Sequence, residues 1–249
     1  MAFQLIEDAS LSAIVQNLAA MVGYPVPSDP AGDTDPAVGQ MVQAVNLAGT
    51  DMLSLHDWQE LTKPYTISII ADAPGQTEKS FALPEDFYEF IDQTQWNATN
   101  QLPALGPISP QFWQQLLIRT ALPTLSFYWQ VRDNMLYILA PPVGAQSLTF
   151  FYQSLAWVRD QDNPALYKNR VTKNGDIVLL DAYLTTLLAR VKWLEMKGFD
   201  SAAAMRDFQV NFETRKGNER GAPVLSMVRT FGLPLIQPMT NTPDTGFGS

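Results

Sequence analysis

Apolar residues near the start of the chain recur with the spacing of one helix face. They stand three or four positions apart up to Gly23, at Leu11, Ile14, Val15, Leu18 and Val22. This spacing predicts a helix over residues 9–22. Residues 25–36 are rich in Pro, Gly and Asp and have no periodic apolar face, so we expect a loop there.

A second helical pattern follows this loop. Asp35 is placed to cap a helix, and Pro36 occupies the first helical position, where a missing N–H costs nothing. Apolar side chains then alternate in steps of three and four, at Val38, Met41, Val45, Ala48, Met52 and Leu55. This seam is too short for a free coiled coil, so it predicts a bundle helix over residues 36–61 that ends before Pro64.

From Tyr65 the apolar pattern changes to a period of two, which indicates half-buried strands. Residues 65–71 and 148–154 have this pattern, and residues 125–131 and 135–139 flank a turn at residues 132–134 that is typical of a hairpin. Ser109 and Pro110 open a short predicted helix over residues 109–117. Residues 64–158 are therefore expected to form a mostly antiparallel β region.

Helical spacing returns in the last third of the chain. A second seam of the same length stops at Gly198 and contains Ile177, Leu180, Leu184, Leu187, Val191 and Leu194. A further helix is predicted over about residues 200–216, with Met205, Phe208 and Phe212 on its apolar face. Two seams of equal length are typical of long partner helices in one bundle.

These elements predict an α+β fold with three parts. Residues 1–63 and 159–220 would form a four-helix bundle. An antiparallel β domain, residues 64–158, would be inserted between helices two and three of that bundle. Residues 221–249 would form an extended C-terminal arm, because they hold four Gly and four Pro and show no sustained period.

The predicted arm is too apolar for a plain solvated tail. Its apolar residues are Val224, Leu225, Met227, Val228, Phe231, Leu233, Leu235, Ile236 and Met239. Docking of these side chains along another chain would gain roughly 25 cal/mol per Å² of buried apolar surface, against the entropy cost of ordering the arm. We therefore predict that these nine residues bind a partner.

Composition and charge narrow the possible functions. The 249 residues include no cysteine and one histidine, which excludes disulfides, thiolate catalysis and Cys-ligated zinc. The first 118 residues carry 14 acidic and 2 basic side chains, and the remainder carry 11 and 14. An acidic half disfavours DNA wrapping and permits contact between unlike halves of neighbouring copies. Without a long apolar run or a signal-peptide pattern at residues 1–8, we expect a soluble protein that is not exported by a standard signal.

Three groups of residues could carry chemistry, and each has a plainer explanation. Asp29, Asp33 and Asp35 lack the full spacing of a calcium loop and its distal Glu, so turn formation and helix capping are expected. His56 has no partner His or Cys at metal-ligand spacing. The third group consists of Glu85, Asp86, Glu89 and Asp92, near Trp96 and Trp113. Paired carboxylates beside tryptophans could form a sugar cleft, but a run of charges is more often a solvated acidic rim.

Nucleotide-binding and hydrolase motifs are missing from the sequence. It contains no Gly-x-x-x-x-Gly-Lys loop, no Gly-x-Gly-x-x-Gly turn after a strand, and no Gly-x-Ser-x-Gly elbow. We expect no cofactor and no metal.

Two segments carry a resemblance to a known family. Residues 83–97 read Leu-Pro-Glu-Asp-Phe-Tyr-Glu-Phe-Ile-Asp-Gln-Thr-Gln-Trp-Asn, and residues 102–113 read Leu-Pro-Ala-Leu-Gly-Pro-Ile-Ser-Pro-Gln-Phe-Trp. With the hairpin and the aromatic strand that follow, the chain resembles the head-to-tail adaptor proteins of short-tailed bacteriophages, also called tail accessory factors. The matching order of elements covers roughly residues 36–220.

The resemblance implies a structural protein of the virion neck, assembled in the host cytoplasm. Such adaptors form a ring of twelve copies that joins the portal to the tail nozzle. Their C-terminal arm reaches onto the portal, and genomic DNA passes through the ring without sequence-specific binding. The alternative from another class is a peptidoglycan-degrading virion enzyme, or an adaptor with such a secondary activity, for which Glu85 and Glu89 are the first suspects. A third alternative is a stand-alone soluble bundle with a β insertion.

Overall fold

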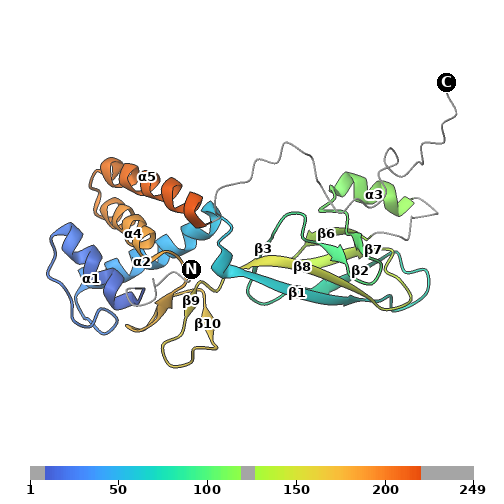
Figure 1. The fold of residues 1–249 in the computed structure, drawn as a ribbon, viewed down its shortest axis with the longest axis horizontal. Helices are drawn as coiled ribbons and strands as arrows, with labels where there is room; N and C mark the ends of the chain where they lie inside the picture. The colour runs from blue at the N-terminus through green and yellow to red at the C-terminus, as the bar shows by residue number, and fades with distance from the viewer. Residues whose placement is uncertain (1–8, 119–126, 220–249) are drawn as a thin grey trace, which may run out of the picture. The chain divides into compact units, whose positions relative to one another are not determined.

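The computed structural model of the chain describes residues 9–118 and 127–219. Within them, α1 (Leu11–Val22), α2 (Pro36–Leu55), α4 (Ala182–Lys197) and α5 (Ala202–Glu219) are the four predicted long helices (Figure 1). The short helix α3 (Pro110–Ile118) is also present, as predicted. None of the helices in these residues is both long enough and apolar enough to cross a membrane.

Capping residues set the ends of the helices. Ser10 accepts a hydrogen bond from the Ala13 N–H at the start of α1, and Gly23 ends that helix with φ 72°. Asp35 accepts from the Ala37 N–H at the start of α2, with Pro36 in the first position as predicted. These local signals explain why the first two helices begin close to the predicted residues.

A single hydrophobic cluster connects the long helices. It is formed by the buried faces of α1, α2 and α4 together with Ala204, Phe208 and Phe212 of α5. The seams of α2 and α4 pack against each other, as the equal lengths of the two seams predicted. Trp157, which is fully buried, joins this cluster from outside the helices.

The largest sheet has five strands arranged around β8 (Gln146–Ser154). β1 (Thr62–Ile69) pairs antiparallel with β8 along its full length, from Thr62 opposite Gln153 to Ile69 opposite Gln146. β3 (Phe87–Phe90) and β4 (Trp96–Asn97) also pair with β8, and β5 (Leu102–Pro103) pairs with β4. Figure 1 shows the long β1–β8 ribbon.

A second antiparallel sheet is built around the predicted hairpin. β6 (Tyr128–Arg132) and β7 (Met135–Leu139) pair directly, and β2 (Glu78–Ala82) pairs with the other edge of β7. Asp133 and Asn134 have positive φ, as a two-residue hairpin turn requires. The core between the two sheets is largely aromatic and includes Trp129, Phe150 and Tyr152.

The predicted four-helix bundle with one inserted β domain is wrong. The described residues form five helices and eleven strands in three antiparallel sheets, and α3 lies within the β region. The third sheet has the order β10–β9–β11, from β9 (Val158–Arg159), β10 (Tyr167–Lys168) and β11 (Ile177–Val178). It falls in the stretch expected to be helical, because strands of two residues leave no period that a sequence pattern could reveal.

Two helix ends also differ from the prediction. The helix predicted over residues 36–61 ends at Leu55, and η1 (Gln59–Leu61) is a separate short 3₁₀ helix. The Trp58 indole donates to the Met52 carbonyl at 2.8 Å and so satisfies one of the last acceptors of α2. The second seam was expected to be helical from Ile177. That residue instead belongs to β11 and pairs with Arg159 of β9, and α4 begins at Ala182 with Asp181 as its cap.

The predicted C-terminal arm lies outside the described residues. All nine of its apolar candidates, from Val224 to Met239, follow Glu219, where α5 ends. Their role as a partner-binding segment stays a prediction, as do the domain boundaries at residues 63, 158 and 220.

Candidate functional site

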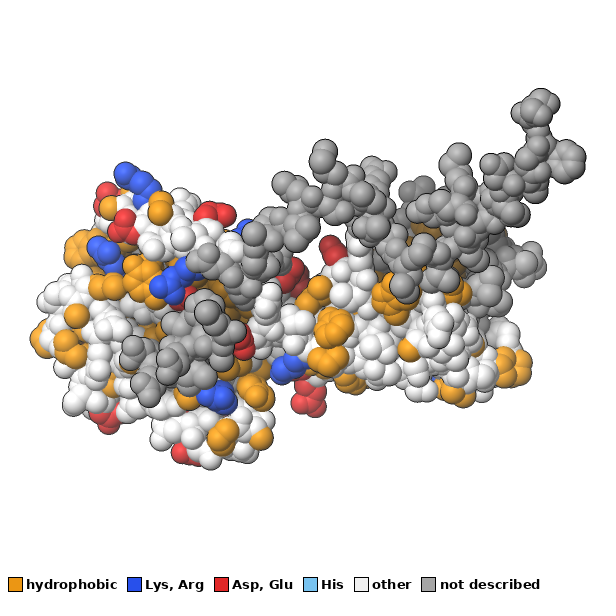
Figure 2. Space-filling view, in the orientation of Figure 1, with side chains coloured by type: hydrophobic (Ala, Val, Ile, Leu, Met, Phe, Trp, Pro, Cys, Tyr) orange, Lys and Arg blue, Asp and Glu red, His pale blue; other side chains and the backbone are white. Residues whose placement is uncertain are grey.

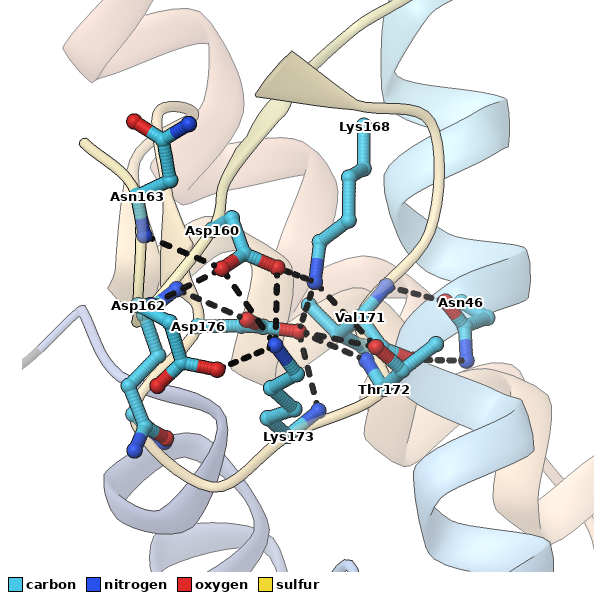
Figure 3. Close-up of polar contacts among 11 residues, drawn as sticks. Asn46, Asp160, Asp162, Asn163, Lys168, Val171, Thr172, Lys173 and Asp176 are labelled. Atoms are coloured by element: carbon cyan, nitrogen blue, oxygen red, sulfur yellow. Dashed lines mark hydrogen bonds and ion pairs between the residues drawn. The ribbon is translucent and has the colours of Figure 1, made fainter. Parts of the chain in front are cut away.

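The segment from Arg159 to Asp176 contains many side-chain hydrogen bonds and ion pairs. It joins the strands of the third sheet and contains long stretches without regular structure. Figure 3 shows five of its charged side chains turned toward one another: Asp160, Asp162, Lys168, Lys173 and Asp176. Surface loops fixed in this way are frequently functional, because binding residues need a rigid support.

Asp176 is the centre of this segment, and its side chain is fully buried. It accepts hydrogen bonds from the backbone N–H groups of Gln161 at 3.1 Å, Thr172 at 2.8 Å and Lys173 at 2.9 Å. The Lys168 ammonium pairs with it at 2.7 Å. Burial alone would raise the pKa of Asp176, but the bonds from Lys168 and the backbone outweigh burial and lower the pKa below its usual range. The buried group is therefore a carboxylate.

Asp160 is the second buried carboxylate, with 6% of its side chain exposed. Lys168 pairs with it at 2.8 Å, and the N–H groups of Asp162 and Asn163 donate to it at 2.8 and 3.2 Å. The Lys168 hydrogen bond is the main cause of the lowered pKa of Asp160. Lys173 pairs with both Asp160 and Asp162 and closes the network at its outer side.

The ammonium of Lys168 lies between the two buried carboxylates and bonds to both. Burial acts to lower the pKa of Lys168, but its bonds to Asp160 and Asp176 raise the pKa above the usual value. Lys168 thus stays charged and offsets part of the negative charge of the two buried carboxylates. Among the residues that the structure describes, no group of three or more His, Cys, Asp or Glu side chains is arranged to hold a metal ion.

Asn46 of α2 ties this segment to the helices. Its Oδ1 accepts from the Val171 N–H at 2.9 Å, and its Nδ2 donates to the Val171 carbonyl at 3.3 Å (Figure 3). Both Asn46 and Val171 are buried. A buried backbone N–H and C=O are thereby satisfied by one side chain, which fixes the segment against the middle of α2.

Asn169 and Arg170 are exposed, and they lie in sequence between Lys168, which is held by its ion pairs, and Val171, which is held by Asn46. Beside them is an open hollow of about 220 Å³ on α2, lined by Gln43, Asn46, Leu47, Thr50, Asn169 and Arg170. Arg170 makes no hydrogen bond or ion pair with any residue in the described ranges. Among the residues that the structure describes, the guanidinium of Arg170 at this polar hollow therefore has no charged partner.

The three predicted loop aspartates take the structural roles expected of them. Asp35 caps α2 and accepts a short hydrogen bond from the Tyr24 hydroxyl, and this bond lowers the pKa of Asp35. Asp29 accepts from the Gly32 N–H at 3.1 Å and from Asn174, and Asp33 accepts from the Asp35 N–H at 2.9 Å. His56 follows the end of α2, is 6% exposed and lies edge-on to Trp58.

The suspected acidic rim does not form one cleft with its tryptophans. Asp86 is occupied by Lys63 at 2.6 Å, Ser154 at 2.6 Å and Tyr152 at 2.8 Å. Trp113 is 1% exposed and donates to Glu78, so its ring face is unavailable to a sugar.

Glu85 and Glu89 are both exposed. Partial burial, and then the negative charges of Asp57 and Asp92, raise the pKa of Glu89. Asp57 and Asp92 therefore act electrostatically on Glu89.

Charge is unevenly distributed over the face of the molecule seen in Figure 2. Red and blue side chains gather mainly over the long helices, whereas the surface over the sheets is mainly uncharged and partly hydrophobic. Ile70, Val131 and Phe151 are among the large apolar side chains of the β region that are at least one third exposed. Weakly charged surfaces of this kind suit contact with other proteins.

The chain matches a known protein family over most of its length. Residues 10–228 match the family model described as SU10 adaptor protein. The match includes every helix and strand described above, together with the ion-pair network and the hollow. A search of curated proteins gave no match.

Proposed function

This chain belongs to the SU10 adaptor protein family, and on that premise we propose that it is the structural head-to-tail connector of a short-tailed phage virion. The observation that carries the proposal is the family match over residues 10–228. The connector would join the portal to the tail nozzle in the virion neck, after assembly in the host cytoplasm.

The proposed mechanism is multivalent assembly into a closed ring, with twelve copies as the family resemblance implies. Each lateral contact can be weak, because every copy that is already bound raises the effective concentration of the next contact. The low content of charged residues, 16% of the chain, supports surfaces that are covered by neighbours on several sides. The acidic first half of the sequence would let genomic DNA pass along the channel without binding.

The proposed portal contact is the C-terminal arm, residues 221–249. Its nine apolar residues, Val224 to Met239, would be buried on the portal, while the helices and sheets form the ring. Segments that order only when they bind can wrap a large partner surface. A monomer in dilute solution would therefore be compatible with a ring on the portal.

The direct test mixes the full chain with the portal ring of its own phage and measures the mass of the complex. The same measurement is made with a chain truncated after residue 221. The full chain should give a mass that corresponds to portal plus a ring of adaptors, and the truncated chain should lose most of this binding. Equal binding by both chains would refute the arm contact, and no binding by either chain would refute the connector function.

We propose that the chain has a structural role and does not degrade peptidoglycan, and substitution of Glu89 helps to test this. A raised pKa is a property of general acids, so Glu89 is the carboxyl group to examine first. A turbidity assay on purified cell walls should show no clearing by the parent chain or by the Glu85→Gln and Glu89→Gln variants. Clearing by the parent that either substitution abolishes would favour the peptidoglycan-degrading alternative.

A further inference from the structure

Asn174 and Gly175 form the only Asn-Gly pair in the sequence, and such a pair has a chemistry of its own. The backbone nitrogen of the glycine can attack Cγ of the asparagine, because glycine has no Cβ atom to hinder the approach. The new C–N bond closes a succinimide ring, the bond between Cγ and Nδ2 breaks, and Nδ2 leaves as ammonia with the proton that the glycine nitrogen gives up. Water then opens the ring and leaves aspartate or isoaspartate in place of the asparagine.

The contacts of Gly175 require a glycine at this position. Its N–H donates to Oε1 of Gln161 at 2.8 Å. A Cβ atom added to Gly175 would be 2.7 Å from Oε1 and 2.8 Å from Cδ of that side chain. Any other residue would therefore push the Gln161 amide away, and the hydrogen bond to the backbone N–H would be lost.

The contacts of Asn174 require an amide side chain. Its Oδ1 accepts from the Ala31 N–H at 2.8 Å, and its Nδ2 donates to a carboxylate oxygen of Asp29. Its backbone carbonyl accepts from the Ser12 N–H at 3.1 Å. Asn174 thus ties the segment from Arg159 to Asp176 to the connection between α1 and α2 and to the start of α1. An aspartate in its place would lack the donor that Asp29 needs.

The same contacts restrain the atoms that would react. The attacking nitrogen has its proton engaged by the Gln161 amide oxygen, which is too weak a base to remove it. Nδ2 can leave as ammonia only after its bond to Asp29 is broken. The Asp176 N–H donates to the Lys173 carbonyl at 3.1 Å and closes a turn around the pair, which fixes the backbone angle between the two reacting groups. The reaction therefore requires a local opening of the chain.

We propose that Asn174 is a deamidation site gated by the fold. We call its contacts with Asp29 and Ala31, together with the contact of Gly175 with Gln161, the clamp. Asn174 keeps its amide while the clamp is closed and is deamidated when the clamp opens or the chain unfolds. The product places a carboxylate opposite the Asp29 carboxylate, so the two groups repel each other and the clamp does not close again. This inference is independent of the proposed connector function.

The first test measures the rate of deamidation at position 174. The full chain and a synthetic peptide of residues 169–179 are incubated at neutral pH, and mass spectrometry of proteolytic fragments follows the aspartate and isoaspartate products. The folded chain should react at least about tenfold more slowly than the peptide, because more than one hydrogen bond has to open first. Asp29→Ala and Gln161→Ala each remove one contact of the clamp, and each should raise the rate of the full chain at least about fivefold.

Two control variants separate the clamp from general effects. Asp33→Ala removes another exposed carboxylate of the same loop, one that accepts from the Asp35 N–H at 2.9 Å. Gly49→Ala destabilises the chain elsewhere, because the added Cβ atom would be 2.2 Å from the buried indole of Trp157. Both controls should deamidate at nearly the rate of the parent. Circular dichroism of each variant confirms that it is folded.

The second test examines the product of the reaction. Asn174→Asp introduces the deamidated side chain directly and should raise the equilibrium constant of unfolding about fivefold in urea denaturation. Asp29→Asn in the same chain exchanges the carboxylate and the amide between the two positions. The double variant again has one donor and one acceptor at this contact, so it should recover most of the stability of the parent.

Three results would overturn the proposal. A folded parent chain that deamidates as fast as the peptide would show that the fold does not protect Asn174. Rates for Asp29→Ala and Gln161→Ala no higher than those of the two controls would show that the clamp is not the gate. A double variant no more stable than Asn174→Asp would show that repulsion from Asp29 is not what the product introduces.

Discussion

Replacing Gly49 by alanine will destabilise the protein, although alanine is the better helix former. Gly49 lies in the middle of α2, against the fully buried indole of Trp157. A Cβ atom at Gly49 would be 2.2 Å from Cη2 and 2.3 Å from Cζ2 of that indole. Carbon atoms prefer separations of about 3.5–4.0 Å, so the helix or the indole has to move by more than ~1 Å.

The expected magnitude follows from two opposing effects. Overpacking of a tight core typically costs about 1–3 kcal/mol, and the higher helix propensity of alanine returns up to about 1 kcal/mol. Because the approach of this Cβ atom to the indole is so close, the overpacking cost should be near the upper end of that range, and we expect Gly49→Ala to lower the free energy of unfolding by about 2 kcal/mol. Gly39 lies in the same helix but is exposed, and a Cβ atom added there would have no neighbour within 4 Å. Gly39→Ala should raise the free energy of unfolding by about 0.5 kcal/mol.

Urea denaturation followed by circular dichroism measures both variants against the parent. The midpoint should fall for Gly49→Ala and rise slightly for Gly39→Ala, with similar slopes. A Gly49→Ala variant as stable as Gly39→Ala would show that Trp157 does not pack on this glycine. The contact between α2 and the start of the third sheet would then be wrong.

Three further predictions concern the ion-pair network. Asn46→Ala leaves the buried N–H and C=O of Val171 without their partner, so it should cost about 2 kcal/mol in urea denaturation and speed amide hydrogen exchange at Val171. Lys168→Met leaves the buried carboxylate of Asp176 without its ion pair and should lower the free energy of unfolding by about 3 kcal/mol. Lys192→Met breaks a half-exposed pair with Asp51 and should lower it by less than about 1 kcal/mol. Equal losses for the two variants would contradict the buried character of the network. The pKa of Asp176 is lower in the folded chain than in the unfolded chain, so its stabilisation is present above about pH 4 and is lost as the pH falls further. Asp176→Asn should therefore reduce the drop in thermal midpoint between pH 6 and pH 3, and an unchanged drop would refute this reasoning.

Local signals in the sequence were enough to predict the five helices and four of the eleven described strands. The seams of α2 and α4, the cap at Asp35 and the stop at Gly198 depend on neighbouring residues alone. The hairpin turn at Asp133 and Asn134 was likewise predicted from residues close in sequence. The third sheet was not predicted, because its two-residue strands are held by pairing partners and not by an apolar period of their own.

The hollow and its support could not be predicted from spacing. Asn46 and Val171 are 125 residues apart, and no short motif connects an amide in the middle of a helix to a distant backbone. No sequence pattern singled out the aspartates and lysines between Asp160 and Asp176, since sequence does not show which charges become buried. The acidic rim was noticed in the sequence, but only the structure separates the engaged Asp86 from the exposed Glu89.

Lys168 gives the segment between β9 and β11 a cation that cannot diffuse away. Many loops of this size depend on a bound calcium or zinc ion, and they lose their shape when the concentration of that ion falls. Here the positive charge is covalently attached, and its two carboxylate partners are buried, where salt screens weakly. The shape of the loop should therefore persist when chelators are added or salt is raised, whereas exposed ion pairs between subunits should weaken as salt rises. In a particle assembled from such subunits, a change of salt or metal-ion concentration would alter the strength of the contacts between subunits but not the shape of each subunit.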